Sequence, residues 1–172
     1  NYRSAESVNK YIMSGSDVGE SYRPSMTFFG FRYVEISATD DIEIKSVVGE
    51  VVGSATIETG NITTNDESVN KLYQNIIWGQ RGNYLSVPTD CPQRDERLGW
   101  TGDTQIFTHA ATYNANVAGF FDKWCQDLRD SQTAAGSYTD VVPAVPVVGS
   151  TSNGAWTDAG IIVPYTMYMM YN

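Results

Sequence analysis

The sequence predicts a mainly helical chain that begins with a β segment. Residues 1 to about 60 are rich in aromatic and β-branched side chains, which favour strands. After Thr64 the apolar side chains recur at the three- and four-residue spacing of an amphipathic helix. The alternation of helix, loop and helix, with the unusual loops on one side, fits an α/α toroid.

The β segment contains two predicted strands, within residues 22–36 and 42–52, with Asp40 and Asp41 in a turn between them. Two or three strands alone are marginally stable in water. We therefore expect this segment to be the end of a larger β-sandwich.

The first predicted helix covers about residues 66–80 and starts where Asp66 offers a cap and an acidic first turn follows. Gly79 and Gly82 are predicted to end this helix. Trp78 is expected to pack in the core rather than to line a pocket. The predicted apolar face of the helix consists of Val69, Leu72, Tyr73, Ile76 and Ile77.

Three further helices are predicted, at about residues 103–113, 116–132 and 161–171. Trp124 lies on the apolar spacing of the third helix and is expected in the core. His109 falls off the apolar stripe of the second helix and is expected to be partly exposed or hydrogen-bonded. Residues 134–153 form a predicted loop, and a loop of that length is uncommon unless it is functional. The apolar stripe of the second helix consists of Ile106, Phe107, Ala110 and Ala111.

The stretch Asp90–Asp103, DCPQRDERLGWTGD, combines four carboxylates, two arginines, one tryptophan and two glycines. A charged run is ordinarily a solvated surface, but Leu98 and Trp100 are too apolar for that, and sugar rings stack on aromatic side chains. Neighbouring carboxylates raise one another's pKa and arginines lower it, so the sequence leaves the pKa of Glu96 open. A carboxyl group that stays protonated near neutral pH can act as a general acid.

This stretch resembles the signature of the bacterial α-L-rhamnosidases of glycoside hydrolase family 78. The resemblance implies that Glu96 is the general acid and that Asp90 and Asp103 bind rhamnose hydroxyls. It places Trp100 in a wall of the sugar pocket and Arg94 among the residues that bind the substrate.

The segment Trp156-Thr157-Asp158-Ala159 is similar to a W-x-D-A segment that contributes a tryptophan to the family's rhamnose pocket. The resemblance therefore assigns Trp156 to the pocket. Asp158 is expected either to bind the sugar or only to cap the following helix. One concavity is expected to hold Asp90, Glu96, Trp100, Asp103 and Trp156.

The resemblance also implies a fold, because the family's catalytic domain is an (α/α)6 barrel that follows a β-domain. Residues 28–36, FFGFRYVEI, resemble the end of that β-domain. We expect the end of a β-sandwich over residues 1–62 and a truncated N-terminal part of the barrel over residues 63–172.

The family hydrolyses terminal non-reducing α-L-rhamnose with inversion, which requires two carboxyl groups about 6.5–9.5 Å apart. Its general base is a glutamate in a later loop that no residue here matches, so residues 1–172 alone are expected to be inactive. The expected partner is a small-molecule rhamnoside or a rhamnose-containing oligosaccharide, with no cofactor and no metal. A bacterial protein is expected, either cytoplasmic or secreted.

Composition argues against other classes of function. The net charge of -9 and the pI near 4.4 disfavour nucleic-acid binding, and no apolar run is long enough to cross a membrane. Cys91 and Cys125 match no metal-site spacing, even with His109, and reduced thiols are expected.

Two alternatives stay open beside the glycosidase. One is a non-catalytic carbohydrate-binding module, in which the acidic side chains only hold sugar hydroxyls. The other is a divalent-cation site built from Asp90, Glu96 and Asp103, because hard cations take oxygen ligands.

Overall fold

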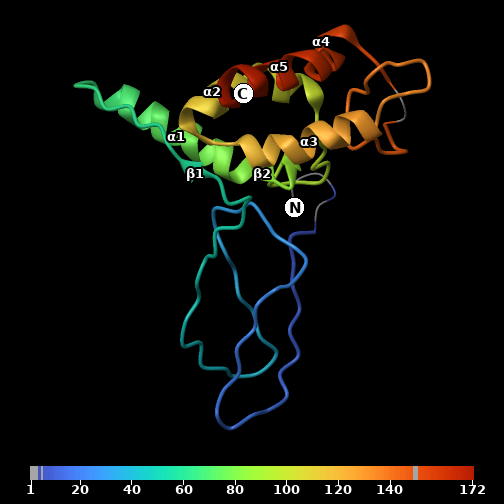
Figure 1. Cartoon of the computed structure of the whole chain (residues 1–172). Helices are drawn as coiled ribbons and strands as arrows, with labels where there is room; N and C mark the ends of the chain where they lie inside the picture. The colour runs from blue at the N-terminus through green and yellow to red at the C-terminus, as the bar shows by residue number, and fades with distance from the viewer. Residues whose placement is uncertain (1–3, 5, 149–150) are drawn as a thin grey trace.

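The computed structural model describes residue 4 and residues 6–148 and 151–172. The described part is mainly helical, as predicted, with the helices gathered at one end of the molecule and the N-terminal segment extending away from them (Figure 1). None of its helices has the length and apolar character needed to cross a bilayer. The helices are α1 (Glu67–Asn83), α2 (Thr101–Asn114), α3 (Ala118–Asp130), α4 (Gly154–Thr157) and α5 (Ala159–Tyr171). The strands are β1 (Ile57–Glu58), β2 (Tyr84–Leu85), β3 (Val87–Pro88) and β4 (Ala115–Asn116).

Helix α1 begins at the predicted cap, where the Asp66 carboxylate accepts hydrogen bonds from the backbone N–H groups of Ser68 and Val69. The prediction that Gly79 and Gly82 end this helix is wrong, because α1 continues through both to Asn83. Each glycine costs about 1 kcal/mol relative to alanine within a helix. We attribute the continuation of α1 past both glycines to tertiary packing, because Tyr84, the residue directly after the helix, is buried in the core.

The buried face of α1 is narrower than the predicted apolar face. Tyr73, Ile77 and Gln80 are buried, whereas Val69, Leu72 and Ile76 are exposed. Trp78 is 53% exposed, and the guanidinium of Arg81 lies 4.4 Å from its ring centroid, so the expectation that Trp78 packs in the core is wrong.

The core forms where α5 packs against α2 and α3. Trp124 is fully buried, as predicted, and its indole N–H donates to the backbone oxygen of Val142 at 3.2 Å. Tyr84 stacks on Phe120 with a centroid separation of 4.5 Å and meets Phe121 edge-on at 5.7 Å. This aromatic cluster joins the hairpin β2–β3 to α3 and so fixes the start of the loop that follows the hairpin.

The buried side of α2 consists mainly of threonine, which the apolar-stripe prediction missed. Ile106 is 82% exposed, whereas Ala111 is buried as predicted. The hydroxyls of Thr104 and Thr108 donate to the carbonyl oxygens four residues earlier, Trp100 and Thr104, so their burial leaves no donor unsatisfied. His109 is exposed, with Nε2 at 3.2 Å from the Tyr113 hydroxyl, in agreement with the prediction.

The predicted loop at residues 134–153 has no helix or strand in its described part, and positions 149 and 150 lie outside the described residues. The loop is attached to the start of α2, because the Thr101 N–H donates to the Asp140 oxygen at 2.9 Å and the Val142 N–H to the Gly99 oxygen at 2.9 Å. The last helix begins earlier than expected, as α4 and α5 together. Asp158 precedes α5 but makes no side-chain cap bond, so the expectation of a capping role is wrong.

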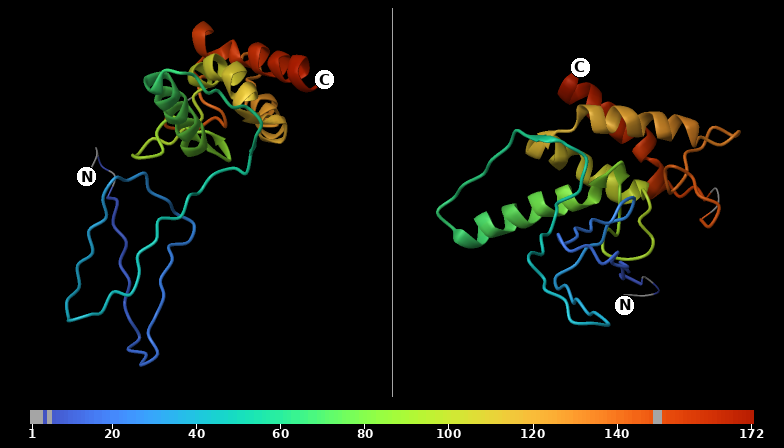
Figure 2. Two further views of the ribbon diagram at one scale, coloured as in Figure 1. Left: turned by 90° about the vertical axis from the view of Figure 1, so that its left-hand side faces the viewer. Right: turned by 90° about the horizontal axis from the view of Figure 1, so that it is seen from below.

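The described residues before Ile57 are extended but form no strand, so the strands expected within residues 22–36 and 42–52 are not formed. Figures 1 and 2 show these residues as long passes that leave the helices and return. Their large apolar side chains, such as Phe31, Tyr33 and Val48, are exposed. Without a covered apolar face, a few extended passes gain too little to form a stable sheet. The short strand β1, which directly follows these residues, pairs with β4.

The two tryptophans Trp124 and Trp78 give a matched test of this core. Trp124→Ala should lower the free energy of unfolding by about 3–5 kcal/mol, because it leaves a cavity in the core. Trp78→Ala should cost less than about 1 kcal/mol, because an exposed cation–π contact is the main loss. Urea unfolding of both variants checks this, and equal losses would contradict the assigned core.

Candidate functional site

The loop between β3 and α2 is closed by Asp90. The backbone N–H of Asp90 donates to the Leu98 oxygen at 3.0 Å, and the Leu98 N–H donates to Asp90 Oδ1 at 2.8 Å. The Cys91 thiol donates to the other carboxylate oxygen, Asp90 Oδ2, at 2.8 Å. The loop therefore folds back on itself before it enters α2, and the Asp90 carboxylate is fixed by its own neighbours.

Glu96 occupies the returning half of this loop in an unusual backbone conformation. Its φ is 123° and that of Arg97 is 53°, a region that residues other than glycine adopt at a cost of about 1–3 kcal/mol. Its side chain accepts hydrogen bonds from Trp100 Nε1, at 2.9 Å from Oε1, and from Arg94 Nη1, at 2.6 Å from Oε2. Strained backbone of this kind clusters at functional sites.

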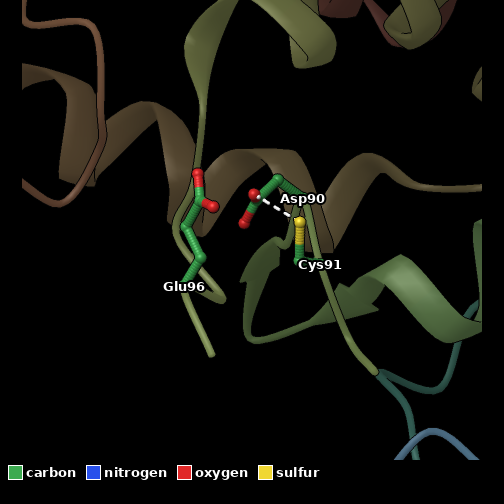
Figure 3. Close-up of side chains that lie close together, drawn as sticks. All are labelled: Asp90, Cys91 and Glu96. Carbon is green, nitrogen blue, oxygen red and sulfur yellow. Dashed lines mark hydrogen bonds between the residues drawn. The ribbon is translucent and has the colours of Figure 1, made fainter. Parts of the chain in front are cut away.

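The carboxyl groups of Asp90 and Glu96 face one another beside the Cys91 thiol (Figure 3). One donor atom from each of these three residues lies within 4.8 Å of the others. Asp103 is not part of this group, so the alternative of a cation site built from Asp90, Glu96 and Asp103 does not match the arrangement found. The Arg94 guanidinium already neutralises Glu96, which disfavours a second cation at the same oxygens.

Hydrogen bonds to Arg94, Trp100 and Asp90 together lower the pKa of Glu96. The hydrogen bond from Arg94 lowers the pKa of the Glu96 carboxyl, and the hydrogen bond from Trp100 lowers it further, against the opposing effect of desolvation. Burial and the hydrogen bond to Asp90 raise the pKa of the Cys91 thiol to about 11. Cys91 and Cys125 are both free thiols, as expected. In this arrangement Glu96 is an ionised carboxylate and Cys91 is a neutral thiol.

A hollow of about 360 Å³ lies between the second half of α1 and the first half of α2, within the size range of small-molecule sites. Asp90, at the start of the loop, and Asp103, in the first turn of α2, both line it. Glu96, Trp100 and Trp156 do not line it. The remaining walls are Ile76, Gly79, Gln80, Asn83, Tyr84, Pro88, Thr89, Thr104 and Phe107.

Trp156 reaches the start of α2 from the far side of the long loop. A Cβ atom added to Gly102 would lie 2.8 Å from Cδ1 and Nε1 of the Trp156 indole, so Gly102 permits this close approach. Gln105 holds α4 in place through a hydrogen bond from its Nε2 to the Ala155 oxygen. The structure thus brings Trp156 against Gly102, the residue before Asp103, but the five predicted residues do not share a single hollow. Asp158 is exposed.

Several polar residues of the hollow were missed by the sequence analysis. Gln80 is buried and binds the Ala111 oxygen and the Asn114 side chain, which keeps its amide on the floor of the hollow. The sequence could have predicted that Gln80 is buried, because it follows the buried residues Tyr73 and Ile77 at helical spacing. No pattern in the sequence marked Asn83, Thr89 and Thr104 as neighbours. They come together in the hollow only because of how α1 packs near α2.

The comparisons with known proteins agree with this architecture. Residues 57–172 match the bacterial alpha-L-rhamnosidase 6 hairpin glycosidase domain, and residues 1–53 match the bacterial alpha-L-rhamnosidase concanavalin-like domain. An alpha-L-rhamnosidase of Streptomyces avermitilis is 48% identical over 99% of this chain and 16% of its own length. One of Formosa agariphila is 45% identical over 98% of this chain and 18% of its own length.

Two solved structures are similar as well. An alpha-L-rhamnosidase from Dictyoglumus thermophilum has a TM-score of 0.66 and 42% identity, over 70% of this chain and 13% of that one. The Streptomyces avermitilis alpha-L-rhamnosidase complexed with L-rhamnose has a TM-score of 0.63 and 52% identity, over 67% of this chain and 11% of that one.

The fold is therefore part of a six-hairpin glycosidase domain that follows the end of a concanavalin-like domain. The chain belongs to the bacterial α-L-rhamnosidase family, which confirms the resemblance seen in the sequence. It spans between 16% and 19% of the length of the curated relatives it matches.

The two donors on Glu96 predict an order of pKa values. Trp100→Phe keeps an aromatic ring but removes the N–H, so the pKa of Glu96 should rise toward its ordinary value. Arg94→Gln should raise it further, because Arg94 is the larger cause of the lowered pKa. Carboxyl ¹³C titration by NMR measures both shifts. Trp156→Phe is the control and should leave the titration of Glu96 unchanged, and an unchanged titration in all three variants would refute the assigned contacts.

Proposed function

We propose that the full-length gene product hydrolyses terminal non-reducing α-L-rhamnose from α-L-rhamnosides with inversion, and that Glu96 is the general acid. The observation that carries this proposal is the fixed Glu96 carboxylate, which faces Asp90 at the edge of a hollow that also exposes Asp103. Relatives named alpha-L-rhamnosidase, and one solved with L-rhamnose bound, support the substrate class.

The hollow is the proposed site of the rhamnose ring. Asp90 and Asp103 accept hydrogen bonds from ring hydroxyls, and several such bonds hold the anomeric carbon in one position. The apolar face of the sugar lies against the aromatic wall formed by Tyr84 and Phe107. We propose Arg94, Trp156 and Asp158 as further sugar contacts, although none of the three lines the hollow itself.

Glu96 can donate a proton only after its pKa rises. A bound sugar would desolvate the carboxyl, and desolvation disfavours the charged form. If Arg94 turns from Glu96 to a substrate oxygen, the main cause of the lowered pKa is lost at the same time. Substrate binding would thereby convert Glu96 from an ionised carboxylate to a proton donor, and Trp100 would keep it oriented during the change.

We assign no general base to residues 1–172, because no carboxylate here has the signal that Glu96 has. The predicted division into residues 1–62 and 63–172 also stays a proposal. The pairing of β1 with β4 attaches residues 57–58 to the helical part.

A non-catalytic sugar-binding module is the second candidate function, and the lowered pKa of Glu96 favours it. An ionised carboxylate accepts hydrogen bonds from sugar hydroxyls but has no proton to donate. Binding of rhamnose without release of rhamnose from any glycoside would identify this function.

Glu96→Gln tests the catalytic assignment. In the full-length gene product it should lower kcat on an aryl α-L-rhamnoside by at least about 10²-fold, because a positioned acid contributes about 10²–10⁴-fold. Rhamnose binding should persist, since Asp90 and Asp103 are intact. Glu67→Gln, at the exposed start of α1, is the matched control and should change neither value. Cleavage of other aryl glycosides but not of the rhamnoside would refute the substrate.

Residues 1–172 alone should show no turnover on the same rhamnoside. One of the two carboxyl groups required by inversion is unassigned here, and exposed apolar side chains along α5, including Ile161 and Tyr165, favour association. Parallel assays of residues 1–172 and of the full-length gene product decide this. Turnover by residues 1–172 within about tenfold of the full-length product would show that the second carboxylate lies within them.

A further inference from the structure

A second hollow, of about 340 Å³, opens beside the Glu96 loop. Glu96 lines this second hollow but not the first, whereas Asp90 lines the first but not the second. Their carboxyl groups face one another (Figure 3), so the Asp90–Glu96 pair stands between the two hollows. The walls of the second hollow are Glu6, Ser7, Phe29, Asp95, Glu96 and Arg97.

Half of these walls come from the N-terminal segment, which three contacts hold against the loop. The Ser4 hydroxyl donates to Asp95 Oδ2 at 2.6 Å. The Arg97 guanidinium lies 4.5 Å from the ring centroid of Phe28. Gly30 packs on Gln93 so closely that an added Cβ would lie 2.7 Å from Gln93 Cβ. The second hollow is therefore formed where the two parts of the chain meet, at the residue proposed as the general acid.

The chemistry of the walls is that of a sugar site. Phe29 provides an aromatic face, and Glu6, Asp95 and Ser7 provide oxygen acceptors for hydroxyl groups. Asp95 Oδ1 is buried without a hydrogen-bond partner among the described residues, and a buried acceptor left unpaired is costly. A ligand with an apolar ring face and hydroxyl donors would match both features.

We propose that the second hollow binds the leaving group of the substrate and that this leaving group is a second sugar stacked on Phe29. The inference rests on the proposed function, since it places rhamnose in the first hollow. The glycosidic oxygen then lies beside Glu96, between the two hollows. As the bond from the anomeric carbon to that oxygen breaks, the oxygen takes the Glu96 proton and the second sugar leaves as a free alcohol. A water oxygen bonds to the anomeric carbon from the opposite face, and the proton of that water passes to the general base, which stays unassigned.

The test replaces Phe29 in the full-length gene product and compares two rhamnosides and inhibition by free L-rhamnose. An aryl α-L-rhamnoside is added as a further substrate that tests the choice of a sugar. Phe29→Ala should lower kcat/KM about tenfold on a disaccharide of α-L-rhamnose linked to glucose. Methyl α-L-rhamnoside, whose methyl group does not reach the second hollow, should change less than about twofold. Inhibition by free L-rhamnose should be unchanged. Ser7→Tyr, which fills the hollow, should reproduce the selective loss.

Phe31→Ala is the matched control, because Phe31 belongs to the same segment but is 62% exposed and does not line the hollow. It should alter none of the three values. An equal loss on the disaccharide and on methyl α-L-rhamnoside would overturn the proposal, because Phe29 would then act on folding or on the rhamnose site. A loss confined to an aryl rhamnoside would overturn the choice of a sugar in favour of a planar aromatic group.

A binding measurement separates this inference from the proposed reaction. Calorimetry in the Glu96→Gln background should show that Phe29→Ala weakens binding of the disaccharide but not of L-rhamnose. That result would support the second hollow even if the unaltered protein released no rhamnose, an outcome that would refute only the hydrolysis. Equal disaccharide affinity with and without Phe29 would overturn the leaving-group site.

Discussion

The two hydrogen bonds between Asp90 and Leu98 are the constraint on which the candidate site depends. They join the outgoing and returning halves of the loop, so the residues between them cannot extend into solvent. This closure places Glu96 opposite the Asp90 carboxylate and accounts for its positive φ, because the loop must turn sharply there. The same carboxylate that closes the loop also lines the first hollow. Structure and proposed sugar binding therefore depend on one side chain.

A second chain of contacts ties this loop to the core. Trp124 donates to the Val142 oxygen, and the Val142 N–H donates to the backbone oxygen of Gly99, two residues before α2. Gly99 approaches the Val142 backbone so closely that a Cβ would collide with the Val142 oxygen. The long loop is thereby part of the scaffold and not a free surface loop. Through it, the packing of α3 sets the position of Trp100 and hence one of the two donors on Glu96.

The electrostatics of the site are dominated by short contacts and not by net charge. The chain carries a net charge of -9, yet the pKa of Glu96 is lowered because Arg94 is bonded to it directly. Without substrate, Glu96 is therefore held as the ionised carboxylate that pairs with Arg94, whereas the proposed reaction needs the protonated form. Exchange of Arg94 between Glu96 and the substrate would couple sugar binding to proton transfer.

The sequence alone determined which residues are proposed to carry the chemistry and where most helices lie. The run from Asp90 to Asp103, the cap at Asp66 and the burial of Trp124 were all predictable, because each is set by local composition, by neighbouring residues or by helical spacing. The extent of α1 beyond Gly79 and the threonine-lined face of α2 were not, because tertiary contacts there outweigh local propensity. The approach of Trp156 to Gly102, the sign of the Glu96 pKa shift and the second hollow depend on which distant atoms become neighbours. Only the tertiary structure decides that, since distances between segments are absent from a linear sequence.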